Sequence, residues 1–493
     1  MANGKQKTKS PKNLGPGLTF DDVLLVPNYS EILPRNVITK TVLTKNISLN
    51  IPFISAAMDT VTEGTMAIAM AQQGGLGIIH KNLSIQDQAA EVARVKRFES
   101  GRILNPMTLP VSATVADALA MQKKYNIGGF PILNEKGILV GIVTNRDLRF
   151  EKNESTPIKK IMTTKLITGT KDTTIGQANI LFKKHGVEKL PLVDKNNKLV
   201  GLITYRDMAK SKEYPNSTKD THGRLRVGAA VGTGSDTLAH VQTLVENDVD
   251  IVCVDTAHGH SKGVLETVRK IRQAYPKLDI MAGNVATGEA ARALIQAGAN
   301  AIKVGIGPGS ICTTRIVSGV GVPQLSAILS VYEVCRSFNI PVIADGGIKH
   351  SGDAVKALVF GADVIMAGSA FAGTDESPGD TIVMNDQKFK KYRGMGSLGA
   401  MQRGSKDRYF QDDQYDLTKL VPEGVSGHVS YKGALSEVIH QLVGGLRAGM
   451  GYLGAKEISE LRGSSFYTMS SAGLNESHVH DIFMVKPTPN YKK

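Results

Sequence analysis

The sequence predicts an α/β fold, a TIM (β/α)8 barrel with a separate domain inserted into it. Two observations predict this architecture. Short apolar runs alternate with helix-like segments along most of the 493 residues, which is the rhythm of parallel strands connected by helices. An internal repeat interrupts that rhythm after the second β-α unit. A doubly wound open sheet is the alternative architecture for the same rhythm.

Eight apolar runs are the expected strands of the barrel. They cover residues 51–59, 74–81, 227–232, 250–255, 279–283, 301–306, 340–344 and 362–367. The helix-like segments that follow them cover residues 62–73, 85–98, 238–245, 263–274, 288–297, 325–337, 352–359 and 435–448. Active sites of such barrels lie at the carboxyl ends of the strands, so the residues after each run are the candidates for chemistry.

The repeat and the polar stretches divide the chain into domains. Residues 1–96 are the expected N-terminal part of the barrel, and their first 17 residues, rich in lysine, proline and glycine, are expected to be disordered. Residues 97–212 hold the repeat. Residues 213–493 complete the barrel and end in a C-terminal tail. Within them, the polar stretch 374–427 is too long for a simple connection and is expected to be a flap.

Composition describes an ordinary globular chain with a diffuse positive charge. Hydrophobic residues make up 41% of it, and the formal net charge of +14 would attract phosphates, acidic metabolites or nucleic acid. Nucleic-acid binding stays open as a secondary activity, although the absence of tryptophan argues against a base-stacking platform. Three cysteines are too few for a disulfide framework, and no apolar run approaches a membrane span. We therefore expect a cytoplasmic protein with free thiols and no membrane partner.

The segment KVGIGPGSICTTR, from Lys303 to Arg315, is the strongest candidate for chemistry. Its glycines allow backbone to approach a ligand closely, and Cys312 sits among hydroxyls where a nucleophilic thiolate is plausible. A dinucleotide-binding turn is one alternative, which Pro308 disfavours because it has no N–H group. A loop with an incidental buried cysteine is the other. Cys253 and Cys335 are expected to be core residues.

Glycine-rich turns follow the seventh and eighth expected strands. Gly346–Gly347 and Gly368–Ser369 leave backbone N–H groups bare, in the two loops where such barrels commonly bind phosphate. We therefore expect a phosphorylated substrate. Other strands also end in polar side chains, namely Asp59, Asp255, Asn284 and Asp345. Two H-x-H pairs, His258 with His260 and His478 with His480, have no evident third ligand, so a histidine metal site is not expected.

The repeat aligns Gly129–Leu148 with Lys189–Met208 without a gap. Each copy ends in T-x-x-D, formed by Thr144 with Asp147 and by Thr204 with Asp207. The pair resembles a tandem of cystathionine β-synthase (CBS) modules. That resemblance implies that these threonine and aspartate residues contact the ribose of a regulatory adenine or guanine nucleotide. A dimerisation module that binds nothing is the alternative.

Five motifs together carry a second resemblance. They are the cysteine loop, DGGI at residues 345–348, YRGMGS at 392–397, DRYF at 407–410 and AGLNESHVHD at 472–481. Their order, with a CBS pair inserted in a barrel, closely resembles the inosine-5′-monophosphate dehydrogenase family of bacterial type over nearly the whole chain. The resemblance implies an NAD-dependent dehydrogenase that oxidises inosine monophosphate (IMP) to xanthosine monophosphate, the committed step of guanine nucleotide synthesis.

The resemblance also implies a two-step mechanism. The thiolate of Cys312 adds to the purine C2, hydride leaves to NAD, and the resulting thioimidate is hydrolysed by water. Arg408 is the implied base for that water, helped by Tyr409 and Thr314. Arginine is an awkward base because its guanidinium is almost always protonated, and the sequence leaves open how it would lose a proton. Departure of NADH would let the Arg408–Tyr409 segment move into the vacated space.

Binding residues follow from the same resemblance. Phosphate is expected at Ser310, the glycine turns and Tyr392, and the ribose hydroxyls at Asp345. The base is expected against Met395 and Gly396, with Glu423 near its N1 edge. The full substrate set is Ser310, Asp345, Gly346, Gly347, Gly368, Ser369, Tyr392, Arg393, Gly394, Met395, Gly396 and Glu423. The set expected for NAD is Asp255, Gly305, Ile306 and Gly307.

A potassium ion is also implied by the resemblance. Its expected ligands are backbone carbonyls of Gly307, Gly309 and Cys312, joined by Glu476, Ser477 and His478 from a neighbouring subunit. Oxygen ligands suit such a hard cation. A site shared between subunits implies a homotetramer, and the pairing of tetramers into octamers is left open.

Three rival functions compete with this interpretation. A guanosine monophosphate reductase would share the barrel and the cysteine loop, but we expect it to lack the inserted repeat and the flap. A catalytically silent nucleotide sensor would not need Cys312, Thr314, Arg408 and Tyr409 together. A generic phosphate-binding isomerase barrel would leave both the cysteine and the flap without a role.

Overall fold

A computed structural model of the protein describes residues 12–98, 103, 106–125, 127–205, 213–411, 413–482 and 490–491. The chain folds into two compact units. The first contains residues 1–95, 216–218 and 226–493, and the second contains residues 96–215 and 219–225. Most of the N-terminal stretch that the sequence predicts to be disordered, residues 1–11, lies outside the described residues.

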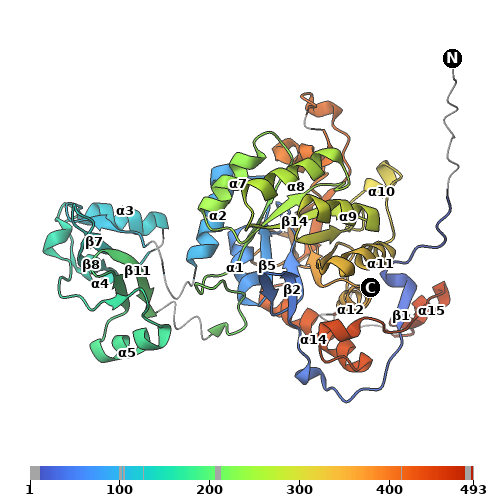
Figure 1. Ribbon diagram of the computed structural model, residues 1–493, viewed down its shortest axis with the longest axis horizontal. Helices are drawn as coiled ribbons and strands as arrows, with labels where there is room; N and C mark the ends of the chain where they lie inside the picture. The colour runs from blue at the N-terminus through green and yellow to red at the C-terminus, as the bar shows by residue number, and fades with distance from the viewer. Residues whose placement is uncertain are drawn as a thin grey trace. The chain divides into compact units, whose positions relative to one another are not determined.

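A closed barrel of eight parallel strands forms the centre of the first unit (Figure 1). The strands are β4 (Phe53–Ser55), β5 (Leu76–Ile79), β12 (Gly228–Val231), β13 (Ile251–Asp255), β14 (Asp279–Val285), β15 (Ala301–Val304), β16 (Val342–Asp345) and β17 (Val364–Ala367). Their order around the barrel is β12-β13-β14-β15-β16-β17-β4-β5. Each strand overlaps one of the predicted runs, so the barrel prediction is confirmed and the open sheet is excluded.

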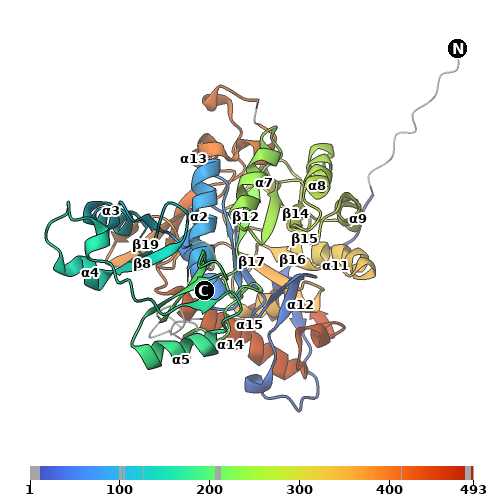
Figure 2. The ribbon, with the colours of Figure 1, turned by 60° about the vertical axis from the view of Figure 1, so that its left-hand side comes forward.

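Helices surround the barrel, as the two views in Figures 1 and 2 show. They are α1 (Gly64–Gln72), α2 (Ile85–Arg97), α7 (Thr237–Glu246), α8 (Lys262–Ala274), α9 (Gly288–Ala297), α11 (Gln324–Cys335), α12 (Ser351–Val359) and α14 (Leu435–Leu453). In α8, the buried Val264, Val268 and Ile271 recur at helical spacing and so line one face. Helix α9 begins where the Thr287 side chain accepts a hydrogen bond from the Ala290 N–H group.

Apolar side chains fill the barrel, including Ile78, Met281 and Met366. Cys253 lies among them, and burial raises the pKa of its thiol. Cys335 is buried on α11, where burial raises its pKa to about 12. Both are core residues, as the sequence predicts. Cys312 is the partly exposed member of the three free cysteines.

The flap, residues 374–427, contains regular structure that the sequence analysis missed. Strands β18 (Thr381–Met384), β19 (Gln387–Arg393) and β20 (Ser426–Ser430) form an antiparallel sheet. Between β19 and β20 the chain passes through a π-helical turn, Met401–Ser405, and a 3-10 turn, Lys406–Tyr409. The sheet gives the flap a folded base from which the second turn reaches the barrel.

The second unit contains the two copies of the repeat. In the first copy, α3 (Val115–Tyr125) precedes a hairpin of β7 (Gly129–Leu133) and β8 (Leu139–Thr144). In the second, α5 (Ile175–His185) precedes a hairpin of β10 (Lys189–Val193) and β11 (Leu199–Thr204). The short strands β6 (Leu109–Pro110) and β9 (Gly169–Thr170) pair in parallel with β7 and β10. Each copy has its own apolar core, around Phe130 and Phe182 respectively.

Shorter elements complete the described chain. They are β1 (Val23–Leu25) paired with β21 (Phe466–Thr468), β2 (Thr41–Thr44) paired with β3 (Ile47–Leu49), α4 (Asn145–Phe150), α10 (Thr314–Val317), α13 (Leu398–Ala400) and α15 (Ser471–Ser477). None of the helices in the described part of the chain is both long enough and apolar enough to span a membrane.

Candidate active site

A pocket opens at the carboxyl ends of the barrel strands, where the fold places catalytic residues. It is closed on one side by the flap. Most residues that the sequence analysis selected for catalysis and binding line this pocket. They are Asp255, Gly305, Ile306, Gly307, Gly309, Ser310, Cys312, Thr314, Asp345, Gly346, Gly347, Gly368, Ser369, Tyr392, Gly394, Met395, Arg408, Tyr409 and Glu423.

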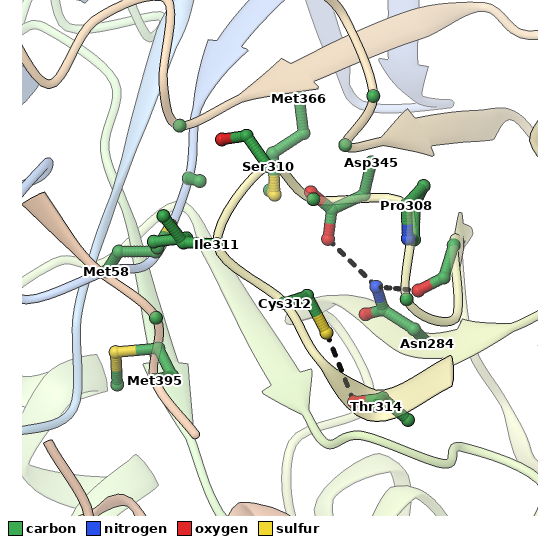
Figure 3. A pocket seen from close by; sticks show the side chains of 18 of the residues that line it. Met58, Asn284, Pro308, Ser310, Ile311, Cys312, Thr314, Asp345, Met366 and Met395 are labelled. Atoms are coloured by element: carbon green, nitrogen blue, oxygen red, sulfur yellow. Dashed lines mark hydrogen bonds between the residues drawn. The ribbon is translucent and has the colours of Figure 1, made fainter. Parts of the chain in front are cut away.

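Cys312 lies on the loop between β15 and α10. Its Sγ atom is 3.1 Å from the Thr314 hydroxyl and 3.7 Å from the carbonyl oxygen of Glu423 (Figure 3). The Thr313 N–H group donates to that carbonyl at 2.9 Å, which ties the loop to the flap. Gly305 begins the loop at φ +148°, and a Cβ atom there would collide with the Asp345 carbonyl. These contacts fix the start and the end of the loop, and Cys312 lines the pocket.

A buried cluster of charged and polar side chains forms the floor of the pocket. The Lys303 ammonium donates to Asp255 at 2.8 Å and to Asp345 at 2.9 Å, and it also contacts Asn284. Asn284 donates to Asp345 at 2.9 Å, as Figure 3 shows. Lys303 is only 1% exposed, so the two carboxylates supply the partners that a buried cation needs. The cluster joins a residue expected to hold ribose, Asp345, to one expected to hold NAD, Asp255.

From the sequence, Lys303 has no expected role, and Asn284 is expected only as a polar side chain at a strand end. A signal for Lys303 was present, because a lysine inside the apolar run 301–306 needs a buried partner.

Met58 also lines the pocket, although it is not among the residues predicted from the sequence. In the view of Figure 3, the side chains of Met58 and Met395 lie on the other side of Cys312 from Asp345. These two thioethers give the pocket an apolar side.

The 3-10 turn of the flap brings Arg408 and Tyr409 into the pocket. The Arg408 guanidinium forms an ion pair with Asp255. The backbone carbonyl of Arg408 accepts a hydrogen bond from the Ala257 N–H group at 3.0 Å. The guanidinium also lies 6.0 Å from the centre of the Tyr409 ring. Burial raises the pKa of Tyr409, so its hydroxyl stays protonated at neutral pH. Asp255 is thus occupied by Arg408 in this arrangement.

The two glycine turns expected to hold phosphate lie beside each other above the barrel. Gly346 and Gly347 have φ values of +92° and +84°, which only glycine adopts easily. A Cβ atom on Gly368 would lie 2.9 Å from the Tyr392 hydroxyl. Burial is the main cause that raises the pKa of Tyr392, and a hydrogen bond with Ser310 opposes it. Backbone N–H groups, a serine and a neutral phenol are suitable donors to a phosphate.

Two predicted substrate residues lie outside this pocket lining. The Arg393 guanidinium donates to Asp59 at 3.0 Å. The backbone N–H group of Arg393 donates to the Thr60 hydroxyl at 3.2 Å. Arg393 is 5% exposed, and these contacts anchor β19 to the barrel. Its role in substrate binding stays a prediction. Gly396 packs against Tyr409, whose ring a Cβ atom would meet at 2.7 Å. Gly396 therefore leaves room for the flap tyrosine, and its contact with the base stays a prediction.

The expected potassium ligands fall into two groups. Gly307, Gly309 and Cys312 share the cysteine loop, whereas Glu476, Ser477 and His478 lie at α15, away from the pocket lining of the same chain. The supply of the second group by another subunit stays a prediction of the resemblance. Backbone carbonyls suit potassium chemically. Among the described residues, no group of three or more histidine, cysteine or acidic side chains could hold a metal ion.

In the second unit, the first T-x-x-D motif caps a helix. Asp147 accepts hydrogen bonds from the Thr144 N–H group at 2.7 Å and from its hydroxyl at 2.8 Å, at the start of α4. This is a capping box, a local reason for the motif that requires no nucleotide. Thr204 ends β11 in the second copy, and Asp207 lies outside the described residues.

Comparisons with known proteins agree with this geometry. The family model described as "IMP dehydrogenase / GMP reductase domain" matches residues 17–480. Inosine-5′-monophosphate dehydrogenase of Aquifex aeolicus (strain VF5) is 56% identical, over 97% of this chain and 98% of the relative. The enzyme of that name from Bacillus subtilis (strain 168) is 57% identical, over 96% and 98% respectively.

A solved structure extends the likeness to a reductase. A cysteine-to-alanine variant of GMP reductase from Trypanosoma brucei, in complex with guanosine 5′-monophosphate, has a TM-score of 0.88 and 40% identity. It covers 95% of this chain and 99% of its own. The uncovered 5% is too small to contain the inserted unit, so the expectation that a reductase lacks the repeat is wrong for this relative. The matches to the family model, the dehydrogenases and this structure show that the chain belongs to the IMP dehydrogenase / GMP reductase family.

Proposed function

We infer that this chain catalyses the NAD-dependent oxidation of inosine monophosphate to xanthosine monophosphate, the committed step of guanine nucleotide synthesis. The observation that carries the inference is the convergence of Cys312 with Arg408 and Tyr409 on one pocket. Sequence identity favours the oxidation of inosine monophosphate over a reductase reaction. The chain is 56–57% identical to the two dehydrogenases and 40% identical to the reductase structure.

The first step uses the cysteine loop. The Cys312 thiolate adds to C2 of the purine, which makes that carbon tetrahedral and allows its hydride to leave. Asp255 and residues 305–307 would hold NAD, which would supply the acceptor for that hydride. The substrate is oxidised by two electrons, and a thioimidate remains bonded to Sγ. The Thr314 hydroxyl, 3.1 Å from Sγ, orients the thiol for this attack.

Substrate orientation comes from the other loops. The phosphate binds the N–H groups of Gly347 and Gly368 with the Ser310 and Tyr392 hydroxyls. Asp345 accepts hydrogen bonds from the ribose hydroxyls, and Lys303 and Asn284 hold its carboxylate in place. The base lies along the methionine side of the pocket, with its C2 directed towards Cys312. Fixing both ends of the nucleotide places C2 within reach of the thiol.

The second step uses the flap. Water adds to the thioimidate carbon and gives a proton to Arg408, the base that the resemblance implies. The C–S bond then breaks, which frees xanthosine monophosphate and the Cys312 thiolate. Arg408 and Tyr409 direct that water and exclude bulk solvent. Asp255 contributes to both steps, because it faces the space that the resemblance assigns to NAD and here pairs with Arg408.

The activity is tested by following NADH absorbance in a mixture of inosine monophosphate, NAD and potassium. The intact chain should form NADH, and the Cys312→Ala variant should not. A parallel assay with guanosine monophosphate and NADPH tests the reductase. Consumption of NADPH without NADH formation in the first assay would contradict the dehydrogenase assignment.

Potassium and oligomerisation are further parts of the proposal. The carbonyls of Gly307, Gly309 and Cys312 would bind the ion, with residues 476–478 of a second subunit completing its shell. Activity should then rise with potassium chloride and stay low in lithium chloride of equal ionic strength. Light scattering should report a tetramer, and dilution to monomers should abolish the potassium response.

The second unit is proposed to be a pair of CBS modules over residues 97–212 that binds a purine nucleotide. The repeated helix-hairpin order of its two copies supports this assignment. Thr144, Asp147, Thr204 and Asp207 are the proposed ribose contacts. Calorimetric titration with adenine and guanine nucleotides tests it, and a Thr144→Val variant that keeps full affinity would restrict this motif to helix capping.

A further inference from the structure

Two neighbouring flap residues of opposite charge meet two barrel residues of opposite charge. Asp407 forms an ion pair with Lys81, which follows β5, and Arg408 forms an ion pair with Asp255 at the end of β13. The Asp407 carboxylate also accepts a hydrogen bond from the Arg408 N–H group at 2.8 Å. The acidic and basic residues of the turn therefore each meet an opposite charge on the barrel rim, at the ends of two strands that flank β12.

The barrel is shaped to receive the Asp407 side of this contact. The Lys81 side chain is 7% exposed and that of Asp407 is 23% exposed. Gly232, which follows β12, leaves the necessary space, since a Cβ atom there would collide with the Asp407 carboxylate and lie 3.0 Å from the Lys81 ammonium. After the next strand, β13, the Ala257 N–H group donates a hydrogen bond to the Arg408 carbonyl. Three consecutive strand ends thus contribute to one docking position for the turn.

Charge explains why the contact favours the docked turn. Burial lowers the pKa of Lys81, and the negative charge of Asp407 opposes that shift. Arg408 lowers this pKa further and Asp236 raises it. A mostly buried ammonium is costly without a partner, so docking of Asp407 removes that cost. The catalytic scheme does not otherwise use this lysine.

We propose that Lys81 is a positioning residue for the hydrolytic step, which acts through Asp407 to dock the flap turn and set Arg408 over the pocket. This rests on the proposed two-step function. Hydride transfer needs the space beside Asp255 for NAD, so the docked turn is not required then. Hydrolysis needs Arg408 in place. The ion pair should therefore control the second step and leave the first intact.

The test compares the first turnover with the steady state in the full-length protein. Variants Lys81→Met, Asp407→Asn and Lys81→Arg are mixed with inosine monophosphate and NAD, and NADH formation is followed in a rapid-mixing instrument. For Lys81→Met and Asp407→Asn, kcat should fall about 10- to 100-fold, because removing one member of a buried ion pair leaves the other unpaired. The NADH burst should keep its rate, and intact mass should show the covalent adduct accumulating.

Two comparisons separate positioning from general damage. Lys81→Arg keeps the charge and should retain most of kcat. Lys406→Met changes a lysine in the same turn whose ammonium contacts the Gln414 carbonyl and lies over the Tyr415 ring, both within the flap, and it should leave kcat within about two-fold. A double variant, Lys81→Asp with Asp407→Lys, should recover activity relative to either of its single changes.

Several outcomes would overturn the proposal. Unchanged kcat in both Lys81→Met and Asp407→Asn would show that the pair has no part in hydrolysis. An equal loss of burst rate and kcat would show a general structural role. If Lys81→Met does not fold, Asp407→Asn alone decides, because Asp407 is partly exposed on the flap. Absence of an NADH burst in the unaltered protein would instead contradict the proposed function, before any variant is considered.

Discussion

The two walls of the active-site pocket are held by different kinds of interaction. The substrate wall is fixed by backbone, as in the hydrogen bonds from Gly305 N–H to the Val285 carbonyl at 3.0 Å and from Gly346 N–H to the Met366 carbonyl at 3.3 Å. The flap wall adds the ion pairs of Asp407 and Arg408 to backbone hydrogen bonds such as the one from Ala257 N–H to the Arg408 carbonyl at 3.0 Å. We therefore expect the substrate wall to stay fixed and the flap wall, which depends on charged side chains as well, to leave and return in the proposed reaction. A reaction that needs NAD first and water second requires that difference.

Removing the proposed nucleophile tests the substrate wall most severely. Cys312→Ala should lower NADH formation by at least about four orders of magnitude, since a nucleophile and its partners act as a unit. Its affinity for inosine monophosphate, measured by calorimetry, should change little, because the phosphate and ribose contacts remain. Residual NADH formation above a few percent of the original rate would assign the chemistry to another group.

A glycine in a preformed turn gives the next largest effect. Gly347→Ala places a Cβ atom 3.0 Å from the Phe20 ring at a φ of +84°, so the turn must distort. We expect KM for inosine monophosphate to rise about ten-fold or more with a smaller change in kcat, because the phosphate contact is lost in every step. Gly352→Ala is the control, since no atom lies within 4 Å of its Cβ position. Equal effects in the two variants would contradict the assignment of the turn.

Docking of the flap wall should depend on pH, whereas the substrate wall should not change with pH. Docking favours the protonated form of Lys81. Burial lowers the pKa of Lys81 and Arg408 lowers it further, whereas Asp407 and Asp236 raise it. As pH rises through this lowered pKa the ammonium is lost, so kcat should fall a few-fold on the alkaline side, below the usual lysine range near 10.5. In Lys81→Arg that fall should move to higher pH. An unchanged alkaline limb would remove Lys81 from the account.

The smallest effect concerns the second unit. Thr144→Ala removes the side-chain half of the capping box at α4 and should lower the free energy of unfolding of that unit by about 1 kcal/mol. Thermal unfolding measured by circular dichroism tests this. The rate of NADH formation without added nucleotide should not change, because neither wall of the pocket contains this residue. A loss of that activity would show that the unit takes part in catalysis directly.

The same contrast explains what could be predicted from the sequence. Strand positions and the turns at Gly346 and Gly368 follow from local apolar runs and glycine, so the barrel and the substrate wall were accessible. The partners of Lys303 and Arg393 were not, because ion pairs join residues far apart in the chain. The hairpin of β18 and β19 had a local signal that was missed. Asn385 and Asp386, both at positive φ, form the two-residue turn that such pairs favour.

The central claim is that one pocket performs two steps. The substrate wall, which carries Cys312, is required for the first step, and the flap wall is required for the second. The most direct measurement mixes the Arg408→Ala variant with inosine monophosphate and NAD, then records NADH and intact mass together. The account predicts one rapid equivalent of NADH per active site, followed by a stall with the nucleotide bonded to Cys312. Sustained turnover without an adduct, or no NADH at all while the unaltered protein is active, would contradict it.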